Sequence, residues 1–403
     1  MWYWIILGLI LLINVWNLFI LFRKYKARNN IIPDSVKDIY DKDEYTKWKE
    51  YSGAKVKLDI IATFVSLAVM VTLYATRVFG LVNNQLINSG YLADFLILLI
   101  SIVASSLAAL PFNYISTMKI EAKYGFNKTT KQTFIGDQIK GVIIGLFLTV
   151  IPALIFRALY QSMGRWSYLV MFAIVLGIML FLMAFIRKLM TISNKFTPLE
   201  DGSLKDKLTN LLNSNGYSIK KIEVMDGSKR STKANAMFAG LGKFKTIVLY
   251  DTLLEQLTED EIVAVFAHEL GHGKHGDVFS GFLRSIFTVA LLCACCILVM
   301  EVPQISVDSG FLSFNFGFVV MLGMDVFFSF TSPFVNLFSS YFSKKQEYAA
   351  DSFAKDQGYK NELISALKKL TKNSLSDISP DPLEVKLSYS HPTLAQRIDN
   401  ITK

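Results

Sequence analysis

Seven apolar runs, each long enough to cross the hydrocarbon core of a bilayer, dominate the chain. They cover residues 2–22, 58–82, 91–112, 141–160, 166–186, 278–300 and 311–342. Because a bilayer admits only segments that satisfy their own backbone hydrogen bonds, runs of this length are expected to be helices. Hydrophobic residues make up 52% of the chain and charged residues only 19%, which excludes a disordered chain. The sequence therefore predicts a mainly helical integral membrane protein with seven spans.

The distribution of basic residues predicts the orientation of these spans. Lys and Arg number ten in 23–57, five in 114–140, thirteen in 187–277 and ten in 343–403. The intervening segments 83–90, 161–165 and 301–309 contain none, one and none. Since basic residues stay on the cytoplasmic side during insertion, we expect the N-terminus outside and the C-terminus in the cytoplasm. The net charge of +9 is then a feature of topology, and no nucleic-acid partner is expected.

The charged residues inside the apolar runs include Arg77, Asp94, Arg157, Arg284 and Asp325. Facing lipid would be costly, so we expect them to face one another or a water-filled interior. Snorkelling toward a membrane surface is the alternative for Asp94 and Arg77. Charges inside the spans therefore favour contacts between the helices or an internal water-filled space.

The polar stretches divide the chain into four parts. We predict transmembrane helices one to five in 1–190, a small cytoplasmic α+β portion in 191–277, helices six and seven in 278–342, and cytoplasmic helices in 343–403. Because Pro333 lies inside the last apolar run, we expect that helix to kink or to continue into the aqueous phase.

The α+β portion is expected to hold a small sheet. We predict a loop at 196–203, a helix to about residue 213, and strands at 219–225, 235–238 and 246–250. Thr258 with Glu261 gives a capping-box signal that opens a further helix. That helix contains the string His268-Glu269-Leu270-Gly271-His272.

This string predicts a metal centre. On a helix His268 and His272 lie one turn apart on one face, so both imidazoles can reach one ion. Glu269 lies beside the first of them, where it can deprotonate an attacking water. The chain has only four histidines, three of them within eight residues, and a chance match to the pattern has odds of roughly one in a thousand. Two imidazoles with a carboxylate and an open position favour zinc, one ion per chain.

A third ligand has to come from another part of the chain. His275 lies about 10 Å along the helix axis from His268, too far to share an ion. A histidine six residues after His272 would complete another known pattern, but that position is Val278.

Glu347 is the best candidate for the third ligand, and Asp351 lies one helical turn on. There Asp351 could accept the second N–H of a ligating histidine and fix its tautomer. Glu301 and Glu362 are the rivals, and Glu301 is predicted on the opposite side of the membrane. On spacing alone, Glu347 and Asp351 are as readily explained as ordinary surface acids.

Over nearly its whole length the chain resembles the CAAX prenyl protease 1 family of integral-membrane zinc metalloproteases. The motifs that carry the resemblance are, in order, YGFNK at 124–128, FTPLEDG at 196–202, NAMFAG at 235–240, HELGH at 268–272, EYAAD at 347–351, and Ser390-His391-Pro392 with Arg397. The string that follows His272 is closer to bacterial relatives, so a prokaryotic member is considered as well. The number of spans favours the prenyl-protease branch.

The resemblance implies roles for further residues. Glu347 would be the third zinc ligand and Asp351 its hydrogen-bonded partner. His391 would take part in catalysis and, with Arg397, border the site and stabilise the oxyanion. Asn235 would lie on a strand edge that pairs with the substrate backbone. The seven helices would form a barrel around a hydrated chamber that the zinc site faces.

Together these features predict a membrane-embedded zinc endopeptidase. Its partners would be the lipid bilayer and a peptide substrate, either a prenylated CAAX C-terminus or short membrane or misfolded peptides. A quality-control or translocon-associated binding factor with secondary proteolysis is the alternative. A transporter or channel is a third class, against which the complete metal motif argues. The membrane would be the cell membrane of a prokaryote, or the endoplasmic reticulum or inner nuclear membrane of a eukaryote.

Overall fold

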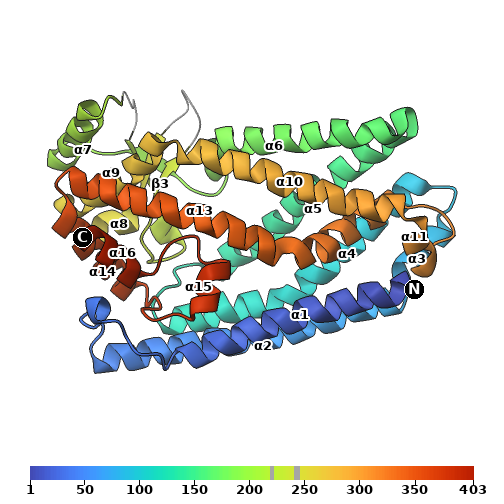
Figure 1. Ribbon diagram of the computed structural model, residues 1–403, viewed down its shortest axis with the longest axis horizontal. Coiled ribbons are helices and arrows are strands. Elements are labelled where there is room, and N and C mark those ends of the chain that lie inside the picture. Colours follow the sequence, from blue (N-terminus) through green and yellow to red (C-terminus); the bar gives the residue numbers. More distant parts are fainter. Residues whose placement is uncertain (218–221, 240–245) are drawn as a thin grey trace.

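The computed structural model describes residues 1–217, 222–239 and 246–403. It is mainly helical, and long helices run along much of its longest axis (Figure 1). The long helices are α1 (Trp2–Ala27), α2 (Lys42–Ala75), α4 (Gly90–Tyr114), α5 (Lys131–Met163), α6 (Ser167–Met190), α10 (Asp277–Glu301), and α12 (Phe316–Leu322) continuing into α13 (Ser329–Asp356). Among the described residues, six stretches are long and apolar enough to cross a membrane, and the one at 131–190 contains both α5 and α6. Each of the seven predicted spans thus corresponds to a helix.

The boundaries of the second span differ from the prediction at both ends. The Asp41 side chain accepts the backbone N–H groups of Asp43 and Glu44, and this capping box starts α2 in polar sequence well before residue 58. The helix ends at Ala75, because Arg77 adopts a left-handed φ of 53° before the short helix α3 (Val78–Gln85). Hydropathy marks the part of a helix that lipid covers, so it misses a polar extension.

The last span continues well beyond its apolar run. Helix α12 passes through a π-helical segment, Gly323–Phe328, into α13, which includes Pro333 and ends at Asp356. The expectation that this helix continues past the apolar run is confirmed. One uninterrupted helical segment, from α12 to α13, therefore contains Asp325 within the span and Glu347 beyond it.

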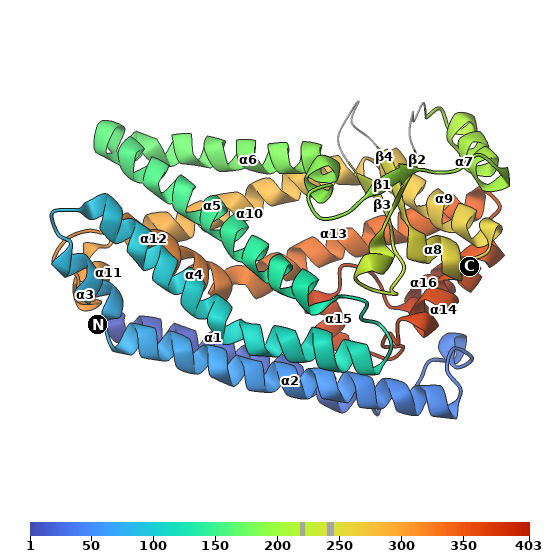
Figure 2. The same cartoon turned by 180° about the vertical axis from the view of Figure 1, so that it is seen from behind.

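Buried apolar side chains gather toward the two ends of the molecule. One cluster, with Ile6, Ile97 and Phe318, packs the end that holds the N-terminus, α3 and α11 (Pro303–Asp308) (Figures 1 and 2). A second cluster, with Leu208 and Phe266, packs the end that holds the C-terminus. Between them few side chains are buried, and in the most apolar stretch of α2 only 6% of the residues are buried. A compact bundle would bury an apolar stripe of every helix, so the spans form an open barrel around an interior space.

A buried ion pair ties three spans together at the N-terminal end. The Nη1 atom of Arg157 in α5 lies 2.7 Å from Oδ2 of Asp94 in α4. The side chain of Asp94 is fully buried. The other oxygen of Asp94 accepts the backbone N–H groups of Phe316 at 2.9 Å and Gly317 at 3.2 Å, and so caps α12. Asp94 therefore pairs with another residue of the spans, as expected, and the alternative that it snorkels to the membrane surface does not hold.

The remaining ionisable residues of the spans have other surroundings. Arg284 donates to the Gln346 side chain at 3.0 Å, linking α10 to α13. Asp325 accepts a hydrogen bond from Ser101 at 3.3 Å and is exposed, and it lines a small cavity together with side chains of α1, α2 and α4. Arg77 is exposed as well. The expectation that these residues face one another thus holds for Asp94 with Arg157.

The polar part contains a four-stranded sheet in the order β1-β2-β4-β3, with β2 and β4 parallel and the outer pairs antiparallel. Its strands are β1 (Phe196–Pro198), β2 (Ile222–Met225), β3 (Ala236–Ala239) and β4 (Thr246–Tyr250). The helices of this part are α7 (Ser203–Ser214), α8 (Asp251–Gln256), α9 (Glu259–His275), α14 (Lys360–Asn373), α15 (Pro382–Ser388) and α16 (Leu394–Thr402). The predicted loop at 196–203 thus contains a strand. Residues 219–221 of the predicted strand, and residue 240 of the quoted NAMFAG motif, lie outside the described residues.

The YGFNK motif joins the membrane helices to this part. Its Asn127 forms an isolated antiparallel bridge with Ser231, and the N–H of Thr232 donates to the carbonyl of Phe126 at 3.1 Å. The ring of Tyr51 in α2 packs edge-on against Phe126, with ring centroids 5.4 Å apart. The motif therefore anchors the segment before β3 to the helical barrel.

Breaking the Asp94–Arg157 pair is expected to destabilise the barrel. Asp94→Ala leaves a buried guanidinium unpaired and removes the cap of α12, which should cost about 3–5 kcal/mol and lower the Tm in detergent. The double variant Asp94→Ala/Arg157→Leu should recover part of that loss, because no buried charge remains unpaired. Asp34→Asn, which breaks the exposed pair with Lys37, is the control and should leave the Tm unchanged. Equal Tm values for wild type and Asp94→Ala would contradict this account.

Candidate metal centre

Helix α9 is fixed in place before it reaches the metal-binding string. The predicted capping box is present, with Thr258 and Glu261 each accepting the backbone N–H of the other. The Glu261 carboxylate also accepts from Ser365 at 2.7 Å and from Lys369 at 2.8 Å, which ties α9 to α14. The middle of the helix is almost wholly buried, so its position is set by packing on both sides.

A close crossing brings α9 against α13, and both helices lie side by side in Figure 1. A Cβ atom at Gly271 would lie 3.0 Å from the Cα of Ala350 and 3.2 Å from the Cβ of Phe353. Such contacts are tighter than nine in ten real Cβ contacts, so a side chain here would push the two backbones apart by a few tenths of an ångström. The crossing places Glu347 of α13 opposite the two histidines of α9.

The structure brings His268, His272 and Glu347 together into a candidate metal site. The two Nε2 atoms lie 3.2 Å apart. Glu347 presents Oε2 at 3.4 Å from Nε2 of His268 and Oε1 at 3.3 Å from Nε2 of His272. Ligands of a tetrahedral zinc ion at about 2.0–2.1 Å lie about 3.3 Å from one another. The donor atoms therefore already have the spacing that such an ion requires.

The hydrogen bonds of the histidines favour a cation at the same point. Nδ1 of His268 lies 2.9 Å from Oδ1 of Asp351, and Nδ1 of His272 lies 2.8 Å from Oδ2 of Asp277. Because a carboxylate accepts, these contacts assign a proton to each Nδ1 and leave a lone pair on each Nε2. Two lone pairs facing each other at 3.2 Å beside a carboxylate repel unless a cation lies between them. The residues therefore fit a bound divalent metal.

Asp277 is a site residue that sequence reasoning missed. Gly276 ends α9 in the left-handed region, with φ 70°, and α10 starts at the next residue. This turn carries Asp277 back to His272. Burial alone would lower the pKa of His272, but the carboxylates of Glu347 and Asp277 raise it to about 9, so without a metal a proton would take the place of the cation at Nε2. A glycine that stops the helix, followed directly by an acid, was the available signal.

Arg397 and His391 also reach the site, from the C-terminal segment. Arg397 of α16 forms a two-point contact with Asp351, at 2.9 Å from Nε and 2.6 Å from Nη2. Nδ1 of His391 lies 2.8 Å from Oε1 of Glu347, although the imidazole is 61% exposed. Arg397 therefore holds Asp351 against His268, while His391 lies at the open side of the site.

Glu269 and Asn235 lie on different elements. Glu269 follows His268 on α9 and is half-buried. Asn235 is exposed and directly precedes β3, an edge strand that packs against α9. The carbonyl of Asn235 accepts the N–H of Tyr250 at 3.1 Å, so its backbone already extends the sheet. Both positions agree with the predicted roles, which stay predictions.

The rival ligands are placed elsewhere. Glu301, at the far end of α10, contacts Arg165 and Tyr168. Glu362 lies in the first turn of α14 and does not belong to the metal-binding cluster found among the described residues. His275 is exposed and packs edge-on against Phe353. Glu347 is therefore the carboxylate that meets the two histidines.

Comparison with known proteins covers both the membrane helices and this site. A family model described as "CAAX prenyl protease N-terminal, five membrane helices" matches residues 21–191, and one described as "Peptidase family M48" matches residues 198–403. The chain is 33% identical to a CAAX prenyl protease 1 homolog of Oryza sativa subsp. japonica, over 98% of this chain and 95% of the relative. It is 32% identical to CAAX prenyl protease 1 of Saccharomyces cerevisiae, over 94% and 90%.

A solved structure is also similar. The crystal structure of S. mikatae Ste24p matches with a TM-score of 0.91 and 29% sequence identity, covering 100% of this chain and 99% of that one. The similarity therefore extends to the arrangement of the helices as well as to the motifs.

Removing the Asp277 carboxylate is expected to weaken metal binding. Asp277→Ala frees the Nδ1 proton of His272 from its acceptor, so metal affinity should fall roughly 10- to 100-fold. Asp277→Asn keeps an acceptor oxygen and should retain most of the affinity. The measurement is bound metal against increasing chelator, by elemental analysis of the purified protein. Equal retention of metal by Asp277→Ala and wild type would refute the role of this contact.

Adding a side chain at Gly271 is expected to separate α9 from α13. Gly271→Val should raise the distance between Glu347 and the histidines and weaken metal binding by about tenfold or more, with Gly271→Ala intermediate. Gly145→Val in α5 is the matched control, because a Cβ there meets nothing within 4 Å. The same chelator titration checks the order of the variants, and normal metal retention by Gly271→Val would count against the close crossing.

Proposed function

Because the chain belongs to the CAAX prenyl protease 1 family of membrane metallopeptidases, we propose that it removes C-terminal peptides from prenylated CAAX proteins with one zinc ion held by His268, His272 and Glu347. The observation that supports the zinc site is the set of donor distances, 3.2, 3.3 and 3.4 Å. Two imidazoles and one carboxylate are the donor set of many catalytic zinc sites. When bound, zinc would supply Lewis acidity that polarises the peptide carbonyl and makes water acidic enough to react near neutral pH.

The protein side chains would then handle the protons and orient the reactants. We propose that Glu269 takes the proton of the attacking water and passes it to the leaving amine. His391, at the open side of the site, would donate to the oxyanion that forms on the scissile carbonyl. Asp351 and Asp277 would keep the protons of the two histidines on Nδ1, and Arg397 would hold Asp351 in place.

The edge of the sheet offers a position for the substrate backbone beside these residues. Strand β3 is the edge of the sheet and packs against α9, so its outer side is suited to a further strand. We propose that the peptide pairs with this edge near Asn235, which would bring one peptide bond over the histidines. Arg397 borders the same site through its contacts with Asp351 and Glu347.

The orientation in the membrane follows from charge. We propose that the basic segments, and with them the metal centre, lie on the cytoplasmic side, and that the N-terminus lies on the other side. In the structure the N-terminus and the C-terminus lie at opposite ends of the long axis (Figure 1). Termini at opposite ends of the long axis would lie on opposite sides of a membrane, which supports an odd number of spans.

Replacing Glu269 is expected to abolish turnover and leave the metal bound. Glu269→Gln keeps the size of the side chain but cannot accept the proton, so kcat should fall by about 10²–10⁴-fold. Glu259→Gln, on the exposed first turn of the same helix, is the matched control and should keep full activity. Mass spectrometry of a farnesylated CAAX peptide measures turnover, and elemental analysis measures metal. Wild-type activity in Glu269→Gln, with contaminating proteases excluded through His268→Ala, would overturn the mechanism.

The substrate class can be tested on the wild-type protein. A farnesylated CAAX peptide should lose its last three residues with a kcat/KM at least tenfold above that of the same peptide with a free cysteine. Mass spectrometry identifies the cleaved bond in both. Equal cleavage of the two peptides would show a peptidase without preference for prenylated substrates.

A further inference from the structure

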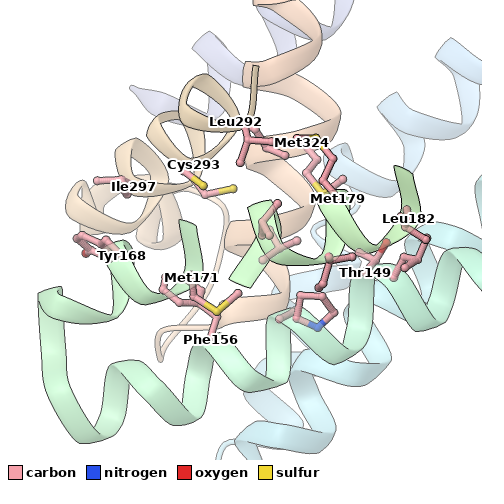
Figure 3. Close-up of a pocket in the computed structure, with 18 residues that line it drawn as sticks. Thr149, Phe156, Tyr168, Met171, Met179, Leu182, Leu292, Cys293, Ile297 and Met324 are labelled. Atoms are coloured by element: carbon pink, nitrogen blue, oxygen red, sulfur yellow. The ribbon is translucent and has the colours of Figure 1, made fainter. Parts of the chain in front are cut away.

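The cavities of the molecule differ in the groups that line them. An apolar cavity of about 320 Å³ lies within the spans, and Phe156 of α5, Met171 of α6 and Cys293 of α10 line it (Figure 3). Among the described residues, no Lys, Arg, Asp or Glu belongs to its lining. Its wall on α10 begins at Val289, about 18 Å along the helix from Asp277, so this cavity is remote from the metal centre.

Two polar cavities lie at the other end of the molecule. The first, of about 320 Å³, adjoins the metal centre, because His391 and Arg397 line it together with Asp377 from the loop after α14. The second, of about 170 Å³, is lined by residues of α14 and of the segment before β3. The residues that line both cavities are Leu367, Thr371 and Ser376. The second cavity is therefore next to the one that reaches the metal centre.

The lining of the second cavity favours an anion. Its polar side chains are those of Lys233, Gln256, Thr371, Asn373, Ser374 and Ser376. An ammonium, two amides and three hydroxyls can all donate hydrogen bonds, and no acid lines this cavity in the part of the chain that the structure describes. In the first cavity an anion would face Asp377. We call the second one the Lys233 cavity, after its cation.

The positive charge of Lys233 is only partly compensated. Its Nζ lies 3.2 Å from Oε2 of Glu121 and donates to the hydroxyl of Tyr51 at 3.1 Å. The other oxygen of Glu121 lies 2.8 Å from Nζ of Lys55. Two ammonium groups thus share one carboxylate, and Lys233 keeps one of its three N–H donors for a further acceptor.

The backbone before β3 connects this cavity to the edge at which we place the peptide. Lys233 and Ala234 line the cavity and directly precede Asn235. The carbonyl of Lys233 accepts the hydroxyl of Thr252 at 3.2 Å, which holds this segment against the start of α8. A peptide that pairs near Asn235 and continues past it reaches Lys233 after two residues, about 7 Å.

The distance from the metal centre suits a peptide end of three residues. Glu261 lies about 10 Å before His268 along the axis of α9. It accepts from Ser365 and Lys369 of α14, and the α14 lining of the Lys233 cavity starts between them, at Leu367. Three extended residues span about 10 Å, and a hydrogen bond adds about 3 Å. A carboxylate three residues past the scissile bond therefore reaches the near side of the cavity.

We propose that the Lys233 cavity binds the C-terminal carboxylate of the peptide substrate, an inference that rests on the proposed function. The carboxylate accepts from the ammonium of Lys233 and from the hydroxyl and amide groups around it. This contact orients the peptide antiparallel to β3, with its C-terminus toward Lys233. It also sets the distance between the end of the chain and the peptide bond over the histidines.

Removing the charge from either partner should have the same effect. In wild type, a farnesylated CAAX peptide with a C-terminal amide should show a KM about five- to tenfold above that of the same peptide with a free carboxylate, because a charge-assisted hydrogen bond is lost. Lys233→Gln should raise the KM of the acid peptide to a similar extent and leave that of the amide peptide unchanged. The kcat should stay within about twofold, since the contact exists before and during the reaction.

The pair of peptides separates recognition from structure. Lys229→Gln, at an exposed position of the same segment and outside the lining, is the matched control and should leave both peptides unaffected. If Lys233 only supports the fold through Glu121 and Tyr51, Lys233→Gln will impair both peptides equally, and the proposal is overturned. Equal KM values for the two peptides in wild type, a comparison that needs no variant, would overturn it as well.

Binding gives a second measurement that needs no turnover. Metal-loaded Glu269→Gln protein should bind a fluorescent acid peptide at least fivefold more tightly than its amide, as measured by anisotropy. In Lys233→Gln/Glu269→Gln the two affinities should be equal. Equal affinities already in Glu269→Gln would reject the carboxylate site. If wild type cleaves neither peptide, the proposed function fails, while the ratio of affinities still reports whether the cavity recognises the carboxylate.

Discussion

The metal centre depends on how closely α9 can approach α13. The absence of a side chain at Gly271 lets the backbone of α13 lie against α9 near Ala350. Glu347, which lies about one turn before Ala350 on α13, contacts the two histidines. Asp351, the residue after Ala350, contacts His268. A wider crossing would leave three donors too far apart to share an ion, so the chemistry of the site follows from a packing constraint between two helices.

Charge balance at this crossing explains why the site suits a metal. Three carboxylates, those of Glu347, Asp351 and Asp277, surround the two imidazoles. Arg397 neutralises Asp351, but Oε2 of buried Glu347 accepts no hydrogen bond from the described residues. The Arg397 guanidinium, 3.7 Å from this oxygen, is shared with Asp351, so a cation between the two Nε2 atoms would supply the charge that Oε2 lacks.

The membrane part and the site share their helices, and this sharing gives the barrel a role beyond anchoring. Helix α10 begins beside the metal centre and runs past the apolar cavity to the far end, while α13 enters the site directly from the last span. The buried pair of Asp94 and Arg157 closes the end opposite the site. Packing at the two ends leaves the space between them open.

Much of this could be read from the sequence, because the signals are local. Apolar runs measure the spans, and the spacing of His268 and His272 places two ligands on one helical face, so neither depends on the rest of the fold. Glu347 and Asp351 were indicated by residue type but were not separable from surface acids by spacing alone; the family resemblance selected them. The polar extension of α2 and the strand at Phe196–Pro198 could not be predicted from the sequence, because neither has an apolar pattern of its own.

Tertiary structure alone decided which distant residues meet. Asp94 caps α12 because α4 crosses α12, and Arg397 reaches Asp351 because α16 packs against α13. The sequence by itself determined the helices, the spans and the pairing of His268 with His272 on one helical face, since these rest on contacts within a few residues. The approach of Glu347 to the two histidines depends on how whole helices pack, a balance of many weak contacts that no short stretch of sequence encodes.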